Sequence, residues 1–164
     1  MALGTTDGSE NGVFRTVTVL SVDPIENDRI TLKQIFGRSE WSLCPNSKWT
    51  LLVSPSAESA ITAVRRNSIP ILVCGCDQEP DTWKKMLREL TPLSNPPLMI
   101  VTSRIADNRL WAEALNLGAY DVLAKPFDQS EVVRTMSMAW MHWKERRDRL
   151  SAPVPYLHAA GAAS

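Results

Sequence analysis

The chain is poor in cysteine, histidine and net charge. Its 164 residues include three cysteines and two histidines, and 18 Lys and Arg residues balance 18 Asp and Glu residues. An odd, low number of cysteines argues against a disulfide framework and is typical of a reducing compartment, so we expect a cytoplasmic protein. Without a basic surplus, electrostatic attraction to a nucleic-acid backbone is missing, and we expect no nucleic-acid partner.

Long hydrophobic runs are also missing. No apolar stretch approaches the roughly 18 residues of a membrane span, and the opening segment MALGTTDGSENG lacks the basic and then apolar regions of a secretory signal. We therefore expect no membrane association. The sequence has no Gly-rich phosphate loop, no His-supported Ser or Cys nucleophile and no set of metal-ligating His and Cys residues. These absences favour a binding protein over an enzyme.

Five short apolar runs, rich in β-branched residues, recur along the chain. They lie at 17–22, 50–54, 71–76, 98–103 and 121–126. Their length and their lack of clean alternation are typical of strands that are covered on both faces. Segments with helical spacing of apolar residues fill the gaps, one of them opened by a capping box of Asp128 and Glu131 and another ended by Gly118. This pattern predicts an α/β fold with a five-stranded parallel sheet and five helices.

The polar ends of the chain set the expected domain boundaries. Residues 1–14 are predicted to be a disordered arm, 15–147 the folded domain, and 148–164 a C-terminal tail. The connection at 37–48 is longer than such loops usually are, and the sequence assigns it no function.

Polar side chains stand at the ends of successive strands. Asp23 follows the first strand, Asp77 and Glu79 the third, Thr102 lies at the end of the fourth, and Lys125 at the end of the fifth. In open parallel sheets, ligands bind beyond these strand ends. Carboxylates can hold a divalent cation, while a lysine and a hydroxyl can take phosphate oxygens. The set is therefore suited to a phosphoryl group.

Three segments together resemble a response-regulator receiver domain: GAYDVLAKPF (118–127), the IVTS that ends at Ser103, and VLSVDPIENDR (19–29). The resemblance implies a flavodoxin-like fold with strand order 2-1-3-4-5 and a role in bacterial two-component phosphorelay signalling. It places Asp23 in the acidic pocket, Thr102 at the hydroxyl that senses phosphorylation, and Lys125 at the invariant lysine. The bond from Lys125 to Pro126 is commonly cis in the family.

The chain departs from the family pattern at three positions. Pro24 stands where the family has a second acid that binds Mg²⁺, and Val122 stands at the switch aromatic. Counting four residues back from Pro80 puts Cys76 at the phosphoacceptor position, with Asp77 next to it. A shift of one residue along a strand turns a side chain to the opposite face, so Cys76 and Asp77 both remain candidates.

These departures predict a degenerate acceptor site. Asp23 with Asp77 or Glu79 would hold Mg²⁺ only weakly, because a hard cation needs several charged oxygen ligands. Without a phosphoryl group to bind, Lys125 should turn to Asp23. No other cofactor is expected.

Two other functions stay open at this point. Next to Lys125, a Cys76 thiolate would be favoured, and the chain would then be a thiol redox-sensing pseudo-receiver. Cys74, two residues earlier on the same strand face, fits small apolar packing. A third interpretation is a small enzyme that uses the cleft at the strand ends.

The favoured hypothesis is a stand-alone receiver-like domain that acts by protein–protein interaction. Its partner would be a sensor kinase or a downstream signalling protein, with a homodimer as a further option. In the family, the fourth helix, fifth strand and fifth helix form the usual partner face, which here would include Trp111, Trp140 and Trp143. The spacing of these residues fits burial in the core as well.

Overall fold

A computed structural model describes residues 15–153. Strands and helices alternate along the chain. The elements are β1 (Arg15–Val22), α1 (Glu26–Arg38), β2 (Ser47–Val53), α2 (Ala57–Arg66), β3 (Ile71–Gly75), α3 (Thr82–Leu90), β4 (Leu98–Ser103), α4 (Asn108–Leu117), β5 (Asp121–Ala124) and α5 (Gln129–Ser151). All strand pairs are parallel, in the order β2-β1-β3-β4-β5. The predicted flavodoxin-like fold is confirmed.

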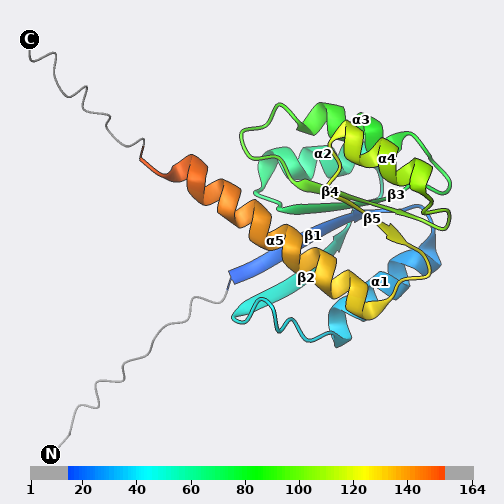
Figure 1. Ribbon diagram of the computed structural model, residues 1–164, viewed down its shortest axis with the longest axis horizontal. Coiled ribbons are helices and arrows are strands. Elements are labelled where there is room, and N and C mark those ends of the chain that lie inside the picture. The colour runs from blue at the N-terminus through cyan, green and yellow to red at the C-terminus, as the bar shows by residue number, and fades with distance from the viewer. Residues whose placement is uncertain (1–14, 154–164) are drawn as a thin grey trace, which may run out of the picture.

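Helices cover both faces of the sheet. Figure 1 shows α1 and α5 on one face and α2, α3 and α4 on the other. The face under α2, α3 and α4 is mainly aliphatic, whereas the face under α1 and α5 is rich in aromatic side chains. The central strand β3 is buried along its whole length, as the unbroken apolar run 71–76 predicted for a strand covered on both sides.

The expected helix ends are present. Asp128 is the N-cap of α5, and its Oδ1 accepts hydrogen bonds from the backbone amides of Ser130 and Glu131. These bonds satisfy two of the four amides that lack a partner inside a helix. Gly118 follows α4 with a φ of 102°, a left-handed conformation that glycine adopts without steric cost.

The long connection at 37–48 packs against the edge of the sheet. Its Trp41 stacks on Trp49 of β2 with ring centroids 4.1 Å apart, and Phe36 of α1 lies against both rings. Cys44, in the same connection, is buried and its thiol donates to the carbonyl of Ser137 in α5. The connection therefore extends the aromatic core beyond α1 and fills the space between α1, β2 and α5.

Two expectations about the C-terminal part need correction. Helix α5 continues to Ser151, so residues 148–151 are helical rather than part of a tail. Trp140 and Trp143 are 5% and 2% exposed and lie in the aromatic core. They cannot contribute to an exposed partner face, because they lie on the side of α5 that packs against the sheet. Of the three tryptophans expected on that face, Trp111 is exposed.

The expected arm at 1–14 and residues 154–164 of the expected tail lie outside the described residues. Between residues 15 and 153, no helix is long and apolar enough to cross a membrane.

Candidate functional site

Three carboxylates converge on one lysine at the carboxyl edge of the sheet. The Nζ atom of Lys125 lies 2.8 Å from Oδ2 of Asp23, 2.8 Å from Oδ2 of Asp28 and 3.0 Å from Oδ2 of Asp77. Its side chain is 1% exposed. All three ammonium protons can therefore be donated to carboxylates. The expected contact between Lys125 and Asp23 is present, together with two further ion pairs.

The parallel sheet brings these groups together. Asp23 follows β1, Asp77 follows β3, and Lys125 follows β5, while Asp28 lies in the first turn of α1. Because the carboxyl ends of parallel strands share one edge, side chains from three strands can meet there without long loops. The peptide bond between Lys125 and Pro126 is cis, as the resemblance implied.

Alternation along β3 decides which side chain reaches the cluster. Ile71 and Val73 lie in the aromatic core, whereas Leu72, Cys74 and Cys76 lie in the aliphatic core. Successive side chains of a strand point to opposite faces, and the Cys76 amide continues the ladder by donating to the carbonyl of Thr102. The side chain of the next residue, Asp77, therefore points to the face on which the cluster lies, and no bulge in the strand is needed.

Gly75 makes room for the cluster. A Cβ atom at this position would lie 2.4 Å from Oδ2 and 2.5 Å from Cγ of Asp23. The carboxylate of Asp23 therefore occupies the space that any larger residue at position 75 would need. Asp23 is held in place because its Oδ1 accepts from the amide of Ile25 at 3.0 Å, and its carbonyl accepts from Nη1 of Arg29 at 2.8 Å.

A second cation closes the cluster from outside. The guanidinium of Arg104 lies 3.0 Å from Oδ1 of Asp28 through Nη2 and 3.3 Å from Oδ2 of Asp77 through Nη1. The backbone amide of Arg104 and the hydroxyl of Ser103 both donate to Oδ1 of Asp77, at 2.9 and 3.0 Å. Asp77 thus accepts hydrogen bonds from Ser103, Lys125 and, twice, Arg104.

These contacts shift the pKa values of Asp77 and Lys125. Burial raises the pKa of Asp77, but the hydrogen bonds from Arg104, Lys125 and Ser103 outweigh it, and the net pKa is lowered. Burial likewise opposes the charge on Lys125, but its hydrogen bonds to Asp23, Asp28 and Asp77 raise its pKa above the ordinary value. Both shifts favour the charged form, the carboxylate of Asp77 and the ammonium of Lys125.

The cluster does not fit a magnesium ion as it stands. Three carboxylates face two cations, and the point where the carboxylates converge is taken by Nζ of Lys125. Pro24 brings no carboxylate of its own. Among residues 15–153, no group of His, Cys, Asp or Glu has the arrangement needed to hold a metal ion.

The remaining predicted site residues lie around the cluster. Thr102 is buried, and its Oγ1 has no hydrogen-bond partner in the described part of the chain. Val122 lies in the aliphatic core. Glu79 is not among the partners of Lys125; its Oε2 accepts from Oγ1 of Thr82 at 3.1 Å at the start of α3. Glu79 and Asp23 do line one cavity of about 280 Å³ beside α2.

The expectation that Lys125 favours a Cys76 thiolate is wrong. Its thiol is buried in the aliphatic core rather than directed at Lys125. Burial is the largest influence on Cys76 and raises its pKa, and neither the hydrogen bond with Ser103 nor the charge of Lys125 compensates for it. Burial also raises the pKa of Cys74 to about 12. A thiol of this kind is mostly protonated and shielded, whereas a reactive one needs the opposite.

Sequence reasoning missed Asp28 and Arg104. Asp28 lies five residues after Asp23 in the first turn of a helix, where acidic residues are common for electrostatic reasons alone. Arg104 directly follows the IVTS segment, in a loop where an exposed arginine is unremarkable in sequence. Asp28 could have been predicted from its place in the first turn of α1, because this helix begins at the carboxyl edge of the sheet.

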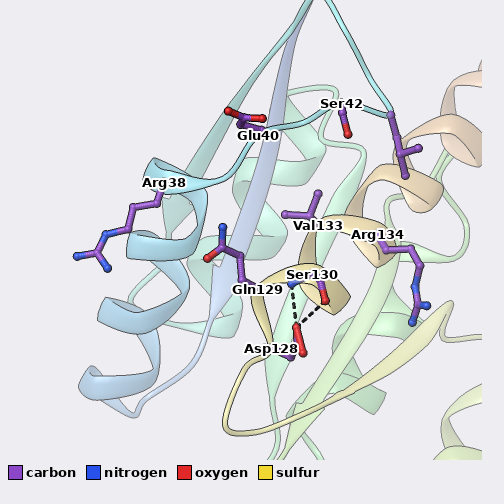
Figure 2. A pocket seen from close by; sticks show the side chains of 9 residues that line it. Arg38, Glu40, Ser42, Asp128, Gln129, Ser130, Val133 and Arg134 are labelled. Carbon is purple, nitrogen blue, oxygen red and sulfur yellow. Dashed lines mark hydrogen bonds between the residues drawn. The ribbon is translucent and has the colours of Figure 1, made fainter.

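A further cavity lies away from the cluster. It measures about 700 Å³ and opens between α1, the 37–48 connection and the first turns of α5. Figure 2 shows Arg38 and Arg134 on opposite sides of it, with Glu40 in the connection and Asp128 hydrogen-bonded to Ser130 below. The carboxylate of Asp128 is therefore already used as the N-cap of α5. The cavity has charges of both signs and no buried polar group without a partner in its lining.

The fold is shared with solved receiver domains. A response regulator from Thermotoga maritima is 18% identical, with a TM-score of 0.63, and the alignment covers 76% of this chain and 97% of that one. The signal receiver domain of an HD-domain protein from Pseudomonas fluorescens Pf-5 is 20% identical, with a TM-score of 0.65 and coverage of 80% and 99%. A signal receiver domain from Vibrio parahaemolyticus is 15% identical, with a TM-score of 0.69 and coverage of 84% and 99%.

No family model matches the chain, and no curated protein matches its sequence. At these low identities the structural similarity shows the fold alone. The chain therefore has the receiver-domain fold of two-component response regulators.

Proposed function

We propose that the chain is a receiver-like signalling domain with a degenerate phosphoacceptor site, which acts by protein–protein interaction rather than by phosphoryl transfer. The observation that carries the proposal is the position of Lys125. Its ammonium group lies among three carboxylates, where a catalytic cation would have to bind. The carboxylates of such a site are already paired with the protein's own side chains.

The surroundings of Asp77 support this proposal. A carboxylate that accepts four hydrogen bonds, two of them from cations, is stabilised as an ion and is a weaker nucleophile. Attack on a phosphodonor would require several of these bonds to break. Phosphoryl transfer also depends on a metal ion to neutralise developing charge, and here Mg²⁺ would have to displace Lys125. We infer that any Mg²⁺ binding is weak.

The residues of the switch support the same conclusion. Within residues 15–153, the buried hydroxyl of Thr102 has no hydrogen-bond partner, and Val122 in the core offers no ring that could move into the space behind it. Substituting Thr102→Ala should therefore alter partner affinity by less than about tenfold, which corresponds to 1.4 kcal/mol. A larger loss would show that a hydroxyl switch survives.

The partner surface that we propose lies on α4. Trp111 and Leu115 are four residues apart on its exposed face, and Ile105 precedes the helix. Residues at this spacing lie side by side on a helix, so they form one apolar strip. A sensor kinase or a downstream signalling protein would bind there, and a second copy of the chain is the other option.

The deciding experiment is exposure to a small phosphodonor with Mg²⁺, followed by intact-mass analysis. We expect no mass gain of about 80 Da. The matched control is the Asp77→Asn variant, which removes the carboxylate but keeps its shape. A base-labile adduct on the wild-type chain that is lost in Asp77→Asn would establish Asp77 as an acceptor and overturn the proposal.

A further inference from the structure

Two cations pair with the three carboxylates of the acidic cluster, and they differ in accessibility. The side chain of Lys125 is 1% exposed, whereas that of Arg104 is 51% exposed. Lys125 binds the inner oxygens of all three carboxylates. Arg104 approaches from the solvent side, and its guanidinium connects Asp28 of α1 to Asp77 at the end of β3.

The oxygens that Arg104 contacts are those that a metal ion would need. Lys125 uses Oδ2 of Asp28, which leaves Oδ1 for Arg104. Oδ2 of Asp77 is shared between the two cations. A hard divalent cation that approaches from solvent must replace water with carboxylate oxygens, and in this protein those oxygens face a guanidinium.

We infer that Arg104 closes the solvent side of the acidic cluster to divalent cations, while Lys125 occupies its centre. The inference rests on the proposed function in one respect, since both hold that the native cluster binds no metal ion tightly. Without the Arg104 charge, three carboxylates would face Lys125 alone. The cluster would then be more negative by one charge and open on its solvent side, which favours a divalent cation.

The side chain and the backbone of Arg104 can be separated experimentally. The backbone amide of residue 104 donates to Asp77 whatever the side chain is, and Ser103 adds a second bond from the same loop. The substitution Arg104→Gln therefore removes the charge while the loop stays attached. Arg104→Lys keeps the charge without the planar fork that matches two carboxylates.

The test is calorimetric titration with MgCl₂ of the wild type, Arg104→Gln, Arg104→Lys and Arg109→Gln. Arg109 is the matched control, because it is an exposed arginine of α4 without an ion pair to another described residue. We expect Arg104→Gln to bind Mg²⁺ about tenfold more tightly than the wild type. Arg104→Lys should stay within about threefold of the wild type, and Arg109→Gln should not change.

A second substitution assigns the binding to the cluster. Adding Asp28→Asn to Arg104→Gln should abolish the gained affinity, because Asp28 supplies the oxygen that Arg104 releases. Circular dichroism confirms that each variant is folded. The inference is overturned if folded Arg104→Gln binds Mg²⁺ no more tightly than the wild type, or if Arg109→Gln gains as much.

Failure of the proposed function gives a different result. In that case the wild type itself would saturate with Mg²⁺ at or below about 1 mM, whatever the variants do. Weak binding by the wild type, with no gain in Arg104→Gln, would overturn the inference on Arg104 and leave the proposed function in place.

Discussion

Cys76 and Asp77 are neighbours in sequence, yet they lie in opposite environments on the two sides of the sheet. Cys76 is buried in the aliphatic core under α2, α3 and α4, and burial raises the pKa of its thiol. Asp77 lies among charged groups, and its pKa is lowered because hydrogen bonds from Arg104, Lys125 and Ser103 outweigh its burial. The face of the strand, rather than the distance to Pro80, determines which of the two residues can take part in charge chemistry.

The largest expected effect comes from removing the central cation. Lys125→Met should lower the free energy of unfolding by about 3–5 kcal/mol, because it leaves three carboxylates without their shared partner. The measurement is urea denaturation followed by tryptophan fluorescence. The control is Lys85→Met, which removes an exposed pair with Glu58 and should cost less than about 1 kcal/mol. An equally small loss for Lys125→Met would mean that the cluster is solvated rather than internally neutralised.

The next effect tests the space on the cluster side of β3. Gly75→Ala places a Cβ 2.4 Å from Oδ2 of Asp23 and should cost about 1–3 kcal/mol through overpacking. Gly37→Ala is the control, since a Cβ there meets nothing within 4 Å and alanine is favoured in a helix by about 0.5–1 kcal/mol. Combining Gly75→Ala with Asp23→Ala should recover part of the overpacking cost in a double-mutant cycle. Strict additivity would argue against a clash between these two residues.

On the other side of the strand, Cys76→Ser buries a hydroxyl in an apolar core and should cost about 1–3 kcal/mol. Cys76→Ala should cost less, because it adds no polar group. In the native protein a thiol reagent should leave Cys76 unmodified until the chain is unfolded in denaturant. Rapid, stoichiometric modification of the native Cys76 thiol would revive the redox-sensing alternative.

The smallest effect is a change in pH dependence. A carboxyl whose pKa is lowered on folding stabilises the protein above its unfolded pKa, which is 3.8 for Asp77, and this contribution is lost as the pH falls through the folded value. Asp77→Asn should therefore make stability less dependent on pH in the region below about pH 4. Asp148→Asn, in an exposed pair with Arg147, is the control and should leave the slope unchanged. Identical slopes for the wild type and Asp77→Asn would contradict the lowered pKa.

The sequence predicted the fold better than it predicted the site. The apolar runs and helical spacings identified the five strands and five helices of residues 15–153, because burial on both sides of a parallel sheet leaves a strong pattern. Pairing extended β1 to Arg15 and β2 back to Ser47, since backbone hydrogen bonds reach beyond the apolar residues. The contact between Lys125 and Asp23 was predictable because both residues end strands at one edge.

The rest of the site depends on tertiary contacts. Counting from Pro80 favoured Cys76, whereas alternation counted from Ile71 would have placed Asp77 on the side of Gly75. Asp28 and Arg104 join the cluster only because α1 and the loop after β4 lie at the same edge. Trp140 and Trp143 were wrongly expected on the partner face for a related reason. Helical spacing alone does not tell which side of α5 packs against the sheet.

The enclosure of Lys125 has a consequence for its reactivity as an amine. Acylating reagents attack the neutral amine, and the three carboxylates both shield this nitrogen and raise its pKa. The other lysines of the described residues are exposed or half-buried. Lys125 should therefore be the last of them to be acylated in the native protein, and its labelling would report the moment at which the acidic cluster opens.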